Sequence, residues 1–226
     1  VEDDGYRMDG IKRDTNKMRL LLRSLARNES TTVTNRTLKN DVKEIDDEDI
    51  DANTINEYLN IFERLFLINN QKPFAASVRS SVRIKQAVKR HFVDPSISAA
   101  LLGVTSSSLL NDLETLGLLF EALCERDLQI YADAFGGSLY LYQDYKNREI
   151  DAVVECPDGE WCAFEIKLGA NQIDAAAEGL LRLKAEFEAD PRGRPPKVLC
   201  VLCGLSNAAY QRPDGVFVVP LTALRD

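Results

Sequence analysis

The stretch EIDAVVECPDGEWCAFEIKL, residues 149–168, decides the fold of this chain. Its two halves, 149–156 and 160–168, contain the β-branched and aromatic residues that favour extended strands. Pro157-Asp158-Gly159 separates them, and this composition is typical of a tight connection between antiparallel strands. The sequence therefore predicts a β-hairpin.

Three ionisable residues stand out because their neighbours are strand residues: Asp151 in the first strand, and Glu165 and Lys167 in the second. Because successive side chains of a strand point to opposite faces, Glu165 and Lys167 share one face, and the hairpin can bring Asp151 beside them. A charged side chain at a half-buried strand position is costly unless it is paired or binds a metal. An ion pair on the solvent face of the hairpin and a metal site both fit this spacing.

The three side chains carry the groups that a divalent-metal site needs. Two carboxylates at one point suit a hard cation such as Mg²⁺, which takes oxygen ligands and keeps several waters. A lysine beside them can orient or help to deprotonate a metal-bound water, and it can stabilise developing phosphate charge.

The segments around the hairpin predict a mixed α/β layer, because helices and strands alternate along the chain. A continuous apolar run at 198–203 indicates a strand that is buried on both faces. The expected elements of this region are helices at 106–124 and 171–188 and strands at 139–145, 149–156, 160–168, 198–203 and 216–219.

The N-terminal part predicts helices and then a short β-ribbon, which is the element order of a winged helix. Asp51 or Asn53 can cap the best-defined helix, at 55–66, where apolar residues recur at three- and four-residue spacing. We therefore expect a leader or upstream linker at 1–17, a winged-helix-like domain at 18–90 with a strand at 77–85, and a second domain at 91–226.

The hairpin also resembles a known family. Asp151, then Glu165-Ile166-Lys167 after thirteen residues, following a long helix that contains Glu121, resembles the PD-(D/E)xK nuclease-like core. This resemblance implies a restriction-endonuclease-like fold. It also implies that Asp151 and Glu165 ligate Mg²⁺ or Mn²⁺, that Lys167 is the catalytic lysine, and that Glu121 supports the metal or a second one.

More narrowly, residues from about 89 to 219 resemble the domain of unknown function that follows the AAA-type module in many prokaryotic ATPases. A winged-helix-like segment joins the two modules in that family, and residues 18–85 fit that place. The resemblance implies that this chain is the C-terminal fragment of a longer ATPase.

The sequence departs from these patterns at three points. Ile150 stands where the nuclease core usually has proline, and no Gln-x-x-x-Tyr pattern follows Lys167. The chain also has no G-x-x-x-x-G-K-[ST] phosphate loop, so it is not expected to hydrolyse ATP by that route.

Composition and charge limit the partners. The chain has 226 residues, of which 45% are hydrophobic and 28% charged, and these are ordinary globular proportions. A formal net charge of -8 excludes a general polyanion binder, so a nucleic-acid surface must be a local patch. The best candidate is a stretch of five cations, although these residues can equally well solvate a ribbon: Arg79, Arg83, Lys85, Lys89 and Arg90.

The sequence predicts a cytoplasmic protein. No apolar run approaches the roughly 20 residues that span a membrane, and no signal peptide is evident. The five cysteines favour reduced thiols. Cys200 and Cys203 are expected in the core, and the single histidine, His91, is expected to be structural.

Two functions follow. The first is a metal-dependent nuclease-like domain that binds or cleaves nucleic acid. The alternative is a catalytically inactive nuclease-like domain that serves an ATPase as an interaction or oligomerisation platform, with homo-oligomers as one outcome. The expected partners are nucleic acid, the upstream ATPase module and a second copy of the chain, without a membrane.

Overall fold

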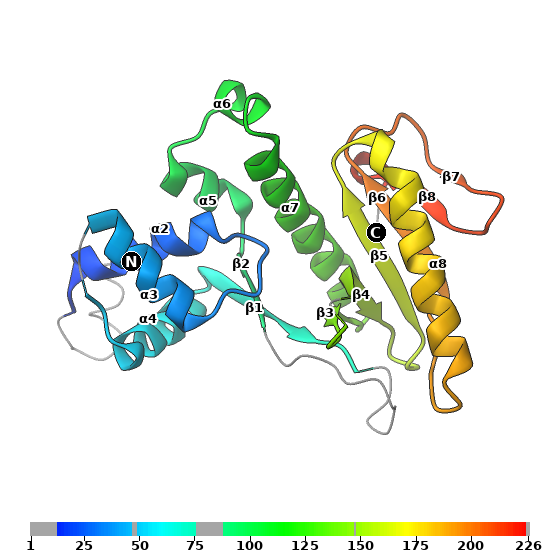
Figure 1. Ribbon diagram of the computed structural model, residues 1–226, viewed down its shortest axis with the longest axis horizontal. Coiled ribbons are helices and arrows are strands. Elements are labelled where there is room, and N and C mark those ends of the chain that lie inside the picture. Colours follow the sequence, from blue (N-terminus) through cyan, green and yellow to red (C-terminus); the bar gives the residue numbers. More distant parts are fainter. Residues whose placement is uncertain (1–12, 47–48, 76–87, 147, 225–226) are drawn as a thin grey trace. The chain divides into compact units, whose positions relative to one another are not determined.

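The computed structural model describes residues 13–46, 49–75, 88–146 and 148–224 (Figure 1). The chain forms two compact units. The first comprises Val1–Asn70 and Val88–Ala122, and the second comprises Gln71–Ala87 and Leu123–Asp226. The chain therefore passes from the first unit to the second within a strand near residue 70 and again within a helix near residue 122.

The first unit is mainly helical. The predicted cap is confirmed, because the Asp51 carboxylate accepts hydrogen bonds from the amides of Asn53 (2.8 Å) and Thr54 (3.0 Å). Its core is formed by apolar side chains on the helix faces, with Leu21 and Phe62 fully buried. Its elements are α2 (Thr15–Arg27), α3 (Asn35–Asp46), α4 (Ala52–Arg64), the start of β1 (Ile68–Pro73), β2 (Lys89–Phe92), α5 (Pro95–Leu102), α6 (Ser106–Leu110) and the first half of α7 (Leu113–Ala134).

The helix expected at 106–124 is two helices in the structure. Asp112 stands between α6 and α7, and its carboxylate accepts hydrogen bonds from the amide (3.1 Å) and the hydroxyl (2.6 Å) of Thr115. A new helix therefore begins with its own acidic cap, and it continues to Ala134. The strand expected at 77–85 lies outside the described residues, and the winged-helix assignment stays a prediction.

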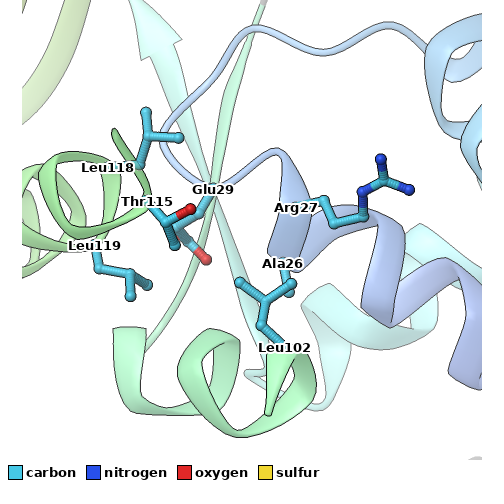
Figure 2. Close-up of a pocket in the computed structure, with 7 residues that line it drawn as sticks. All are labelled: Ala26, Arg27, Glu29, Leu102, Thr115, Leu118 and Leu119. Carbon is cyan, nitrogen blue, oxygen red and sulfur yellow. The ribbon is translucent and has the colours of Figure 1, made fainter. Parts of the chain in front are cut away.

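A pocket of about 170 Å³ lies within the first unit, between the ends of α2 and α5 and the start of α7 (Figure 2). In the part of the chain that the structure describes, no helix combines the length and the apolar character that crossing a membrane requires.

The second unit is built on β-strands. The described strands form one mixed sheet of eight, in the order β2-β1-β3-β4-β5-β6-β8-β7, to which this unit contributes the end of β1 and all strands from β3 onwards. Strands β3, β4 and β5 are antiparallel neighbours, whereas β6 runs parallel to β5 and to β8. This confirms the mixed α/β class. The elements not yet named are β3 (Ser138–Gln143), β4 (Glu149–Glu155), β5 (Trp161–Lys167), α8 (Ile173–Ala189), β6 (Val198–Cys203), β7 (Tyr210–Gln211) and β8 (Phe217–Pro220).

The core of the second unit lies between the sheet and α8. Alternate side chains of β5, Trp161 and Ala163, are buried there with Leu180 and Phe187 of α8. The predicted buried strand is β6, in which Cys200 and Cys203 are 4% and 0% exposed. All five cysteines of the chain are free thiols.

The predicted hairpin turn is confirmed. Gly159 adopts a φ of 82°, in the left-handed region that favours glycine. The Asp158 carboxylate accepts a hydrogen bond from the Glu160 amide at 2.9 Å. The turn fixes the register of β4 against β5, which pairs Val153 with Ala163 and Ala152 with Phe164.

Candidate active site on the hairpin of β4 and β5

The candidate site begins where the paired part of β4 and β5 ends. The register of β4 with β5 ends at the pair Ala152 and Phe164. Beyond it, the Ile166 amide of β5 donates its hydrogen bond to a side chain of β4, namely to Asp151 Oδ2 at 2.7 Å. This contact holds the Asp151 carboxylate over β5. On the other side of β5, Glu165 and Lys167 are in register with Val201 and Cys203 of β6, so β5 is fixed from both sides.

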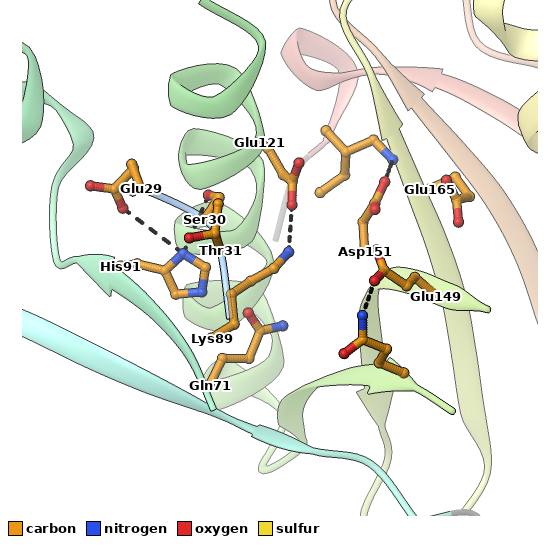
Figure 3. A network of polar contacts seen from close by, with 12 residues as sticks. Glu29, Ser30, Thr31, Gln71, Lys89, His91, Glu121, Glu149, Asp151 and Glu165 are labelled. Carbon is orange, nitrogen blue, oxygen red and sulfur yellow. Dashed lines mark hydrogen bonds and ion pairs between the residues drawn. The ribbon is translucent and has the colours of Figure 1, made fainter. Parts of the chain in front are cut away.

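The structure brings together the three residues that the sequence singled out, of which Asp151 and Glu165 are labelled in Figure 3. The Lys167 ammonium donates a hydrogen bond to Asp151 Oδ2 at 3.0 Å, and it lies 2.7 Å from Glu165 Oε2. The side chains of Asp151 and Glu165 are each 15% exposed, and that of Lys167 is 26% exposed. The cluster is thus largely, but not completely, withdrawn from water.

Burial and neighbouring charges shift the pKa values in this cluster. Desolvation raises the pKa of Glu165 to about 8, and the Asp151 charge adds to this effect against the opposing Lys167 charge. Burial lowers the pKa of Lys167, but the two carboxylates outweigh it and raise that pKa above its ordinary value. Lys167 therefore stays an ammonium ion at neutral pH.

The donor set of the cluster fits a hard divalent cation. Two carboxylates meet there, and one of them is held towards its neutral form because it is desolvated beside the other. A cation would favour the charged form of both carboxylates, and Mg²⁺ and Mn²⁺ prefer oxygen ligands of this kind. Among the described residues, no group of three His, Cys, Asp or Glu side chains is arranged to hold a metal ion.

Glu121, the helical acid implied by the resemblance, belongs to the first unit. Its carboxylate forms an ion pair with the Lys89 ammonium (Figure 3), and these side chains are 19% and 10% exposed. A metal-supporting role for Glu121 therefore has to compete with Lys89.

The basic stretch is only partly described. Besides the ion pair of Lys89, the Arg90 guanidinium donates a hydrogen bond to the Val33 carbonyl at 2.8 Å. These two cations thus have partners within the first unit. The other three proposed contact residues lie outside the described residues: Arg79, Arg83 and Lys85.

A second buried polar network, in the first unit, was not predicted from the sequence. Glu29 is 2% exposed, and its carboxylate accepts hydrogen bonds from the Phe92 amide (3.0 Å) and from the Ser98 hydroxyl. His91 is buried beside it, with Nδ1 at 4.0 Å from Glu29 Oε1 and 3.4 Å from the Ser30 hydroxyl (Figure 3). Nothing in the local sequence around Glu29 distinguishes it from a surface acid.

Comparison with known proteins gives two matches. Residues 1–108 match the model of a Domain of unknown function (DUF8612), and residues 116–224 match that of a second Domain of unknown function (DUF4143). Neither a curated protein nor a solved structure gives a significant match to the chain. The hairpin cluster lies in the second matched region, and the network of Glu29 and His91 lies in the first.

Proposed function

We propose that this chain carries a metal-dependent nuclease-like domain that binds or cleaves nucleic acid, and that it is the C-terminal part of an AAA-type ATPase. One observation carries the proposal: Asp151, Glu165 and Lys167 form a single, largely buried cluster on adjoining strands. The resemblance of this hairpin to the PD-(D/E)xK core supports the choice of reaction, and the place of that domain after an AAA-type module supports the ATPase.

Each residue of the cluster has a distinct role in this proposal. Asp151 and Glu165 would hold Mg²⁺ or Mn²⁺, and Asp151 is already positioned by the Ile166 amide. When bound, such an ion polarises a phosphodiester and lowers the pKa of a coordinated water. Lys167 is charged, so it acts by stabilising negative charge on the phosphate and by orienting water, rather than as a base.

Nucleic acid would be held by the basic stretch. We assign this role chiefly to Arg79, Arg83 and Lys85, because Lys89 and Arg90 have internal partners. Such contacts make affinity fall as salt rises, since each neutralised phosphate releases counterions. The proposal places the protein in the cytoplasm, which the five free thiols support.

Titration calorimetry with Mn²⁺ tests the metal site without a substrate. The wild type should bind, and Asp151→Asn should lose binding, because asparagine keeps an acceptor for the Ile166 amide but removes the charge. Glu178→Gln on α8 is the matched control, since Glu178 is 68% exposed and forms an ion pair with the exposed Arg182, away from the hairpin cluster. Equal binding by wild type and Asp151→Asn would refute this metal site.

A cleavage assay separates metal binding by the two carboxylates from the catalytic role of Lys167. Labelled single- and double-stranded DNA and RNA are incubated with Mg²⁺ or Mn²⁺ and the wild type or Lys167→Ala. We expect Lys167→Ala to bind Mn²⁺ and to cleave none of them. Cleavage at the wild-type rate by Lys167→Ala would exclude a catalytic role for that lysine.

A second candidate function also rests on a specific observation. Lys167 already pairs with both carboxylates, and the raised pKa of Glu165, about 8, lets the cluster carry no net charge at neutral pH without a metal. The alternative is therefore an inactive nuclease-like domain that binds the ATPase or a second copy of itself. It predicts no Mn²⁺ binding by the wild type, together with a concentration-dependent mass in light scattering that Asp151→Asn leaves unchanged.

A further inference from the structure

The pocket in the first unit has an apolar wall and a buried acid (Figure 2). The apolar residues that line it are Leu102 from α5, Leu118 and Leu119 from α7, and Ala26 at the end of α2. Glu29 lines the same pocket, although only 2% of it is exposed. An acid in such surroundings is costly unless a donor or a cation meets it.

The polar groups of this pocket accept hydrogen bonds. Glu29 Oε1 accepts a hydrogen bond from the Phe92 amide, Oε2 accepts one from the Ser98 hydroxyl, and the Ser30 amide also donates to this carboxyl group. Burial raises the pKa of Glu29 to about 7, so above that pH the group is an ionised carboxylate, which has further lone pairs but no proton to donate. The hydroxyl of Thr115, which also lines the pocket, donates its hydrogen to Asp112 Oδ2 at 2.6 Å and so presents only lone pairs. A ligand of this pocket must therefore supply donors.

Above about pH 7, where Glu29 is ionised, its charge points to a cationic donor. The basic group beside it is His91, but burial lowers the pKa of that ring to about 3, so the ring is neutral at neutral pH. The guanidinium of Arg27, which lines the pocket with its stem, is directed away from Glu29 in Figure 2. Neither base thus neutralises the carboxylate.

The size of the pocket sets the size of the ligand. An apolar cavity of about 150 Å³ accepts a molecule as large as benzene, so about 170 Å³ holds a chain of about six heavy atoms. We propose that this pocket binds a small aliphatic primary ammonium compound. Its ammonium donates to Glu29 and Thr115, and its alkyl chain packs among the three leucines. This site is separate from the hairpin cluster and does not depend on a metal.

Three probes of equal length test the proposal on the full chain: n-pentylamine, 1-pentanol and sodium pentanoate. Calorimetry or protein-detected NMR at about pH 8, where Glu29 is ionised and the amine is charged, should show the tightest binding for the amine. Pentanoate should bind at least tenfold more weakly, because its charge meets the Glu29 carboxylate. Glu29→Gln should weaken binding of the amine by about tenfold or more, as expected when a charged hydrogen-bond acceptor is lost.

A steric variant provides the second test. Leu118→Trp fills the pocket and should abolish binding of the amine, whereas Leu113→Trp, on the same helix but 62% exposed and outside the pocket, should bind like the wild type. If Glu29→Gln does not fold, binding of the three probes to the wild type and to the two tryptophan variants still tests the proposal. No binding of the amine, equal binding of all three probes, or full binding by Leu118→Trp would overturn the proposal.

Discussion

Glu29 in the first unit and Glu165 in the second are both buried acids whose pKa is raised by desolvation, to about 7 and about 8. Their neighbours differ. Glu29 meets the neutral donors of Phe92 and Ser98 and faces an apolar pocket, whereas Glu165 lies in a cluster with a second carboxylate and an ammonium. One acid in apolar surroundings suits an organic cation, and two adjoining acids suit a divalent metal. Burial alone therefore does not identify the chemistry of a site.

The largest effect is expected when the ammonium is removed from the charged cluster. Lys167→Met leaves two carboxylates together in a largely buried place, and losing one partner of a buried pair costs about 3 kcal/mol or more. We expect the free energy of unfolding to fall by that amount at pH 8 in a metal-free buffer. Urea unfolding followed by the fluorescence of Trp161 measures it, since this tryptophan is the only one in the chain and is buried in the second unit.

The double variant Glu165→Gln/Lys167→Met provides the control. It removes the like charge together with its counterion and leaves Asp151 with the Ile166 amide, so much of the lost stability should return. If the double variant is as unstable as Lys167→Met alone, the loss comes from packing of the lysine stem and not from charge.

The network of Glu29 and His91 in the first unit should affect how the free energy of unfolding depends on pH. Folded Glu29 keeps its proton up to about pH 7, while unfolded Glu29 loses it near 4.5, so its contribution is lost as the pH rises between these values. Folded His91 stays neutral down to about pH 3, while unfolded His91 gains a proton near 6.5, so its contribution is lost as the pH falls. Between pH 4.5 and 6.5 the two contributions change the free energy of unfolding with opposite slopes, so their pH dependences nearly cancel.

Substituting either residue of this pair removes one of the two slopes, so the two single variants should show pH dependences of opposite sign. Relative to the wild type, Glu29→Gln should lose roughly 3 kcal/mol of unfolding free energy as the pH falls from 6.5 to 4.5, at about 1.4 kcal/mol per pH unit. His91→Gln should lose a similar amount as the pH rises over the same range. Urea unfolding by far-ultraviolet circular dichroism measures both, and slopes of the same sign would contradict the assignment.

The same contrast explains how much of the molecule could be predicted from the sequence. The hairpin cluster was found because its contacts are local: Asp151 and Lys167 are sixteen positions apart and are joined by one turn with a clear signature. Strand alternation is a strong signal when charges interrupt an apolar pattern. The structure brings Asp151, Glu165 and Lys167 together, and their catalytic roles stay predictions.

The network around Glu29 could not be predicted, because its contacts are not local. Glu29 is sixty-nine positions from Ser98, and no spacing rule connects a loop after one helix to the first turn of another. Likewise, periodicity does not predict the break at Asp112, because the leucines on both sides continue a helical spacing, whereas the Asp112 carboxylate accepts from the Thr115 amide and starts a new helix. Long-range packing and capping by a single acid leave little trace in periodicity.

The smallest effect is expected at a lysine–glutamate pair beside the same hairpin, which lacks a second carboxylate and is far more exposed than the pair of Lys167 and Glu165. Lys197 lies 2.9 Å from Glu160, but these side chains are 66% and 52% exposed. Water and salt screen such a pair, so Lys197→Met should leave the free energy of unfolding unchanged within error in the same Trp161 assay. A loss comparable to that of Lys167→Met would show that any lysine next to this hairpin stabilises it, and the special status of the buried cluster would then fail.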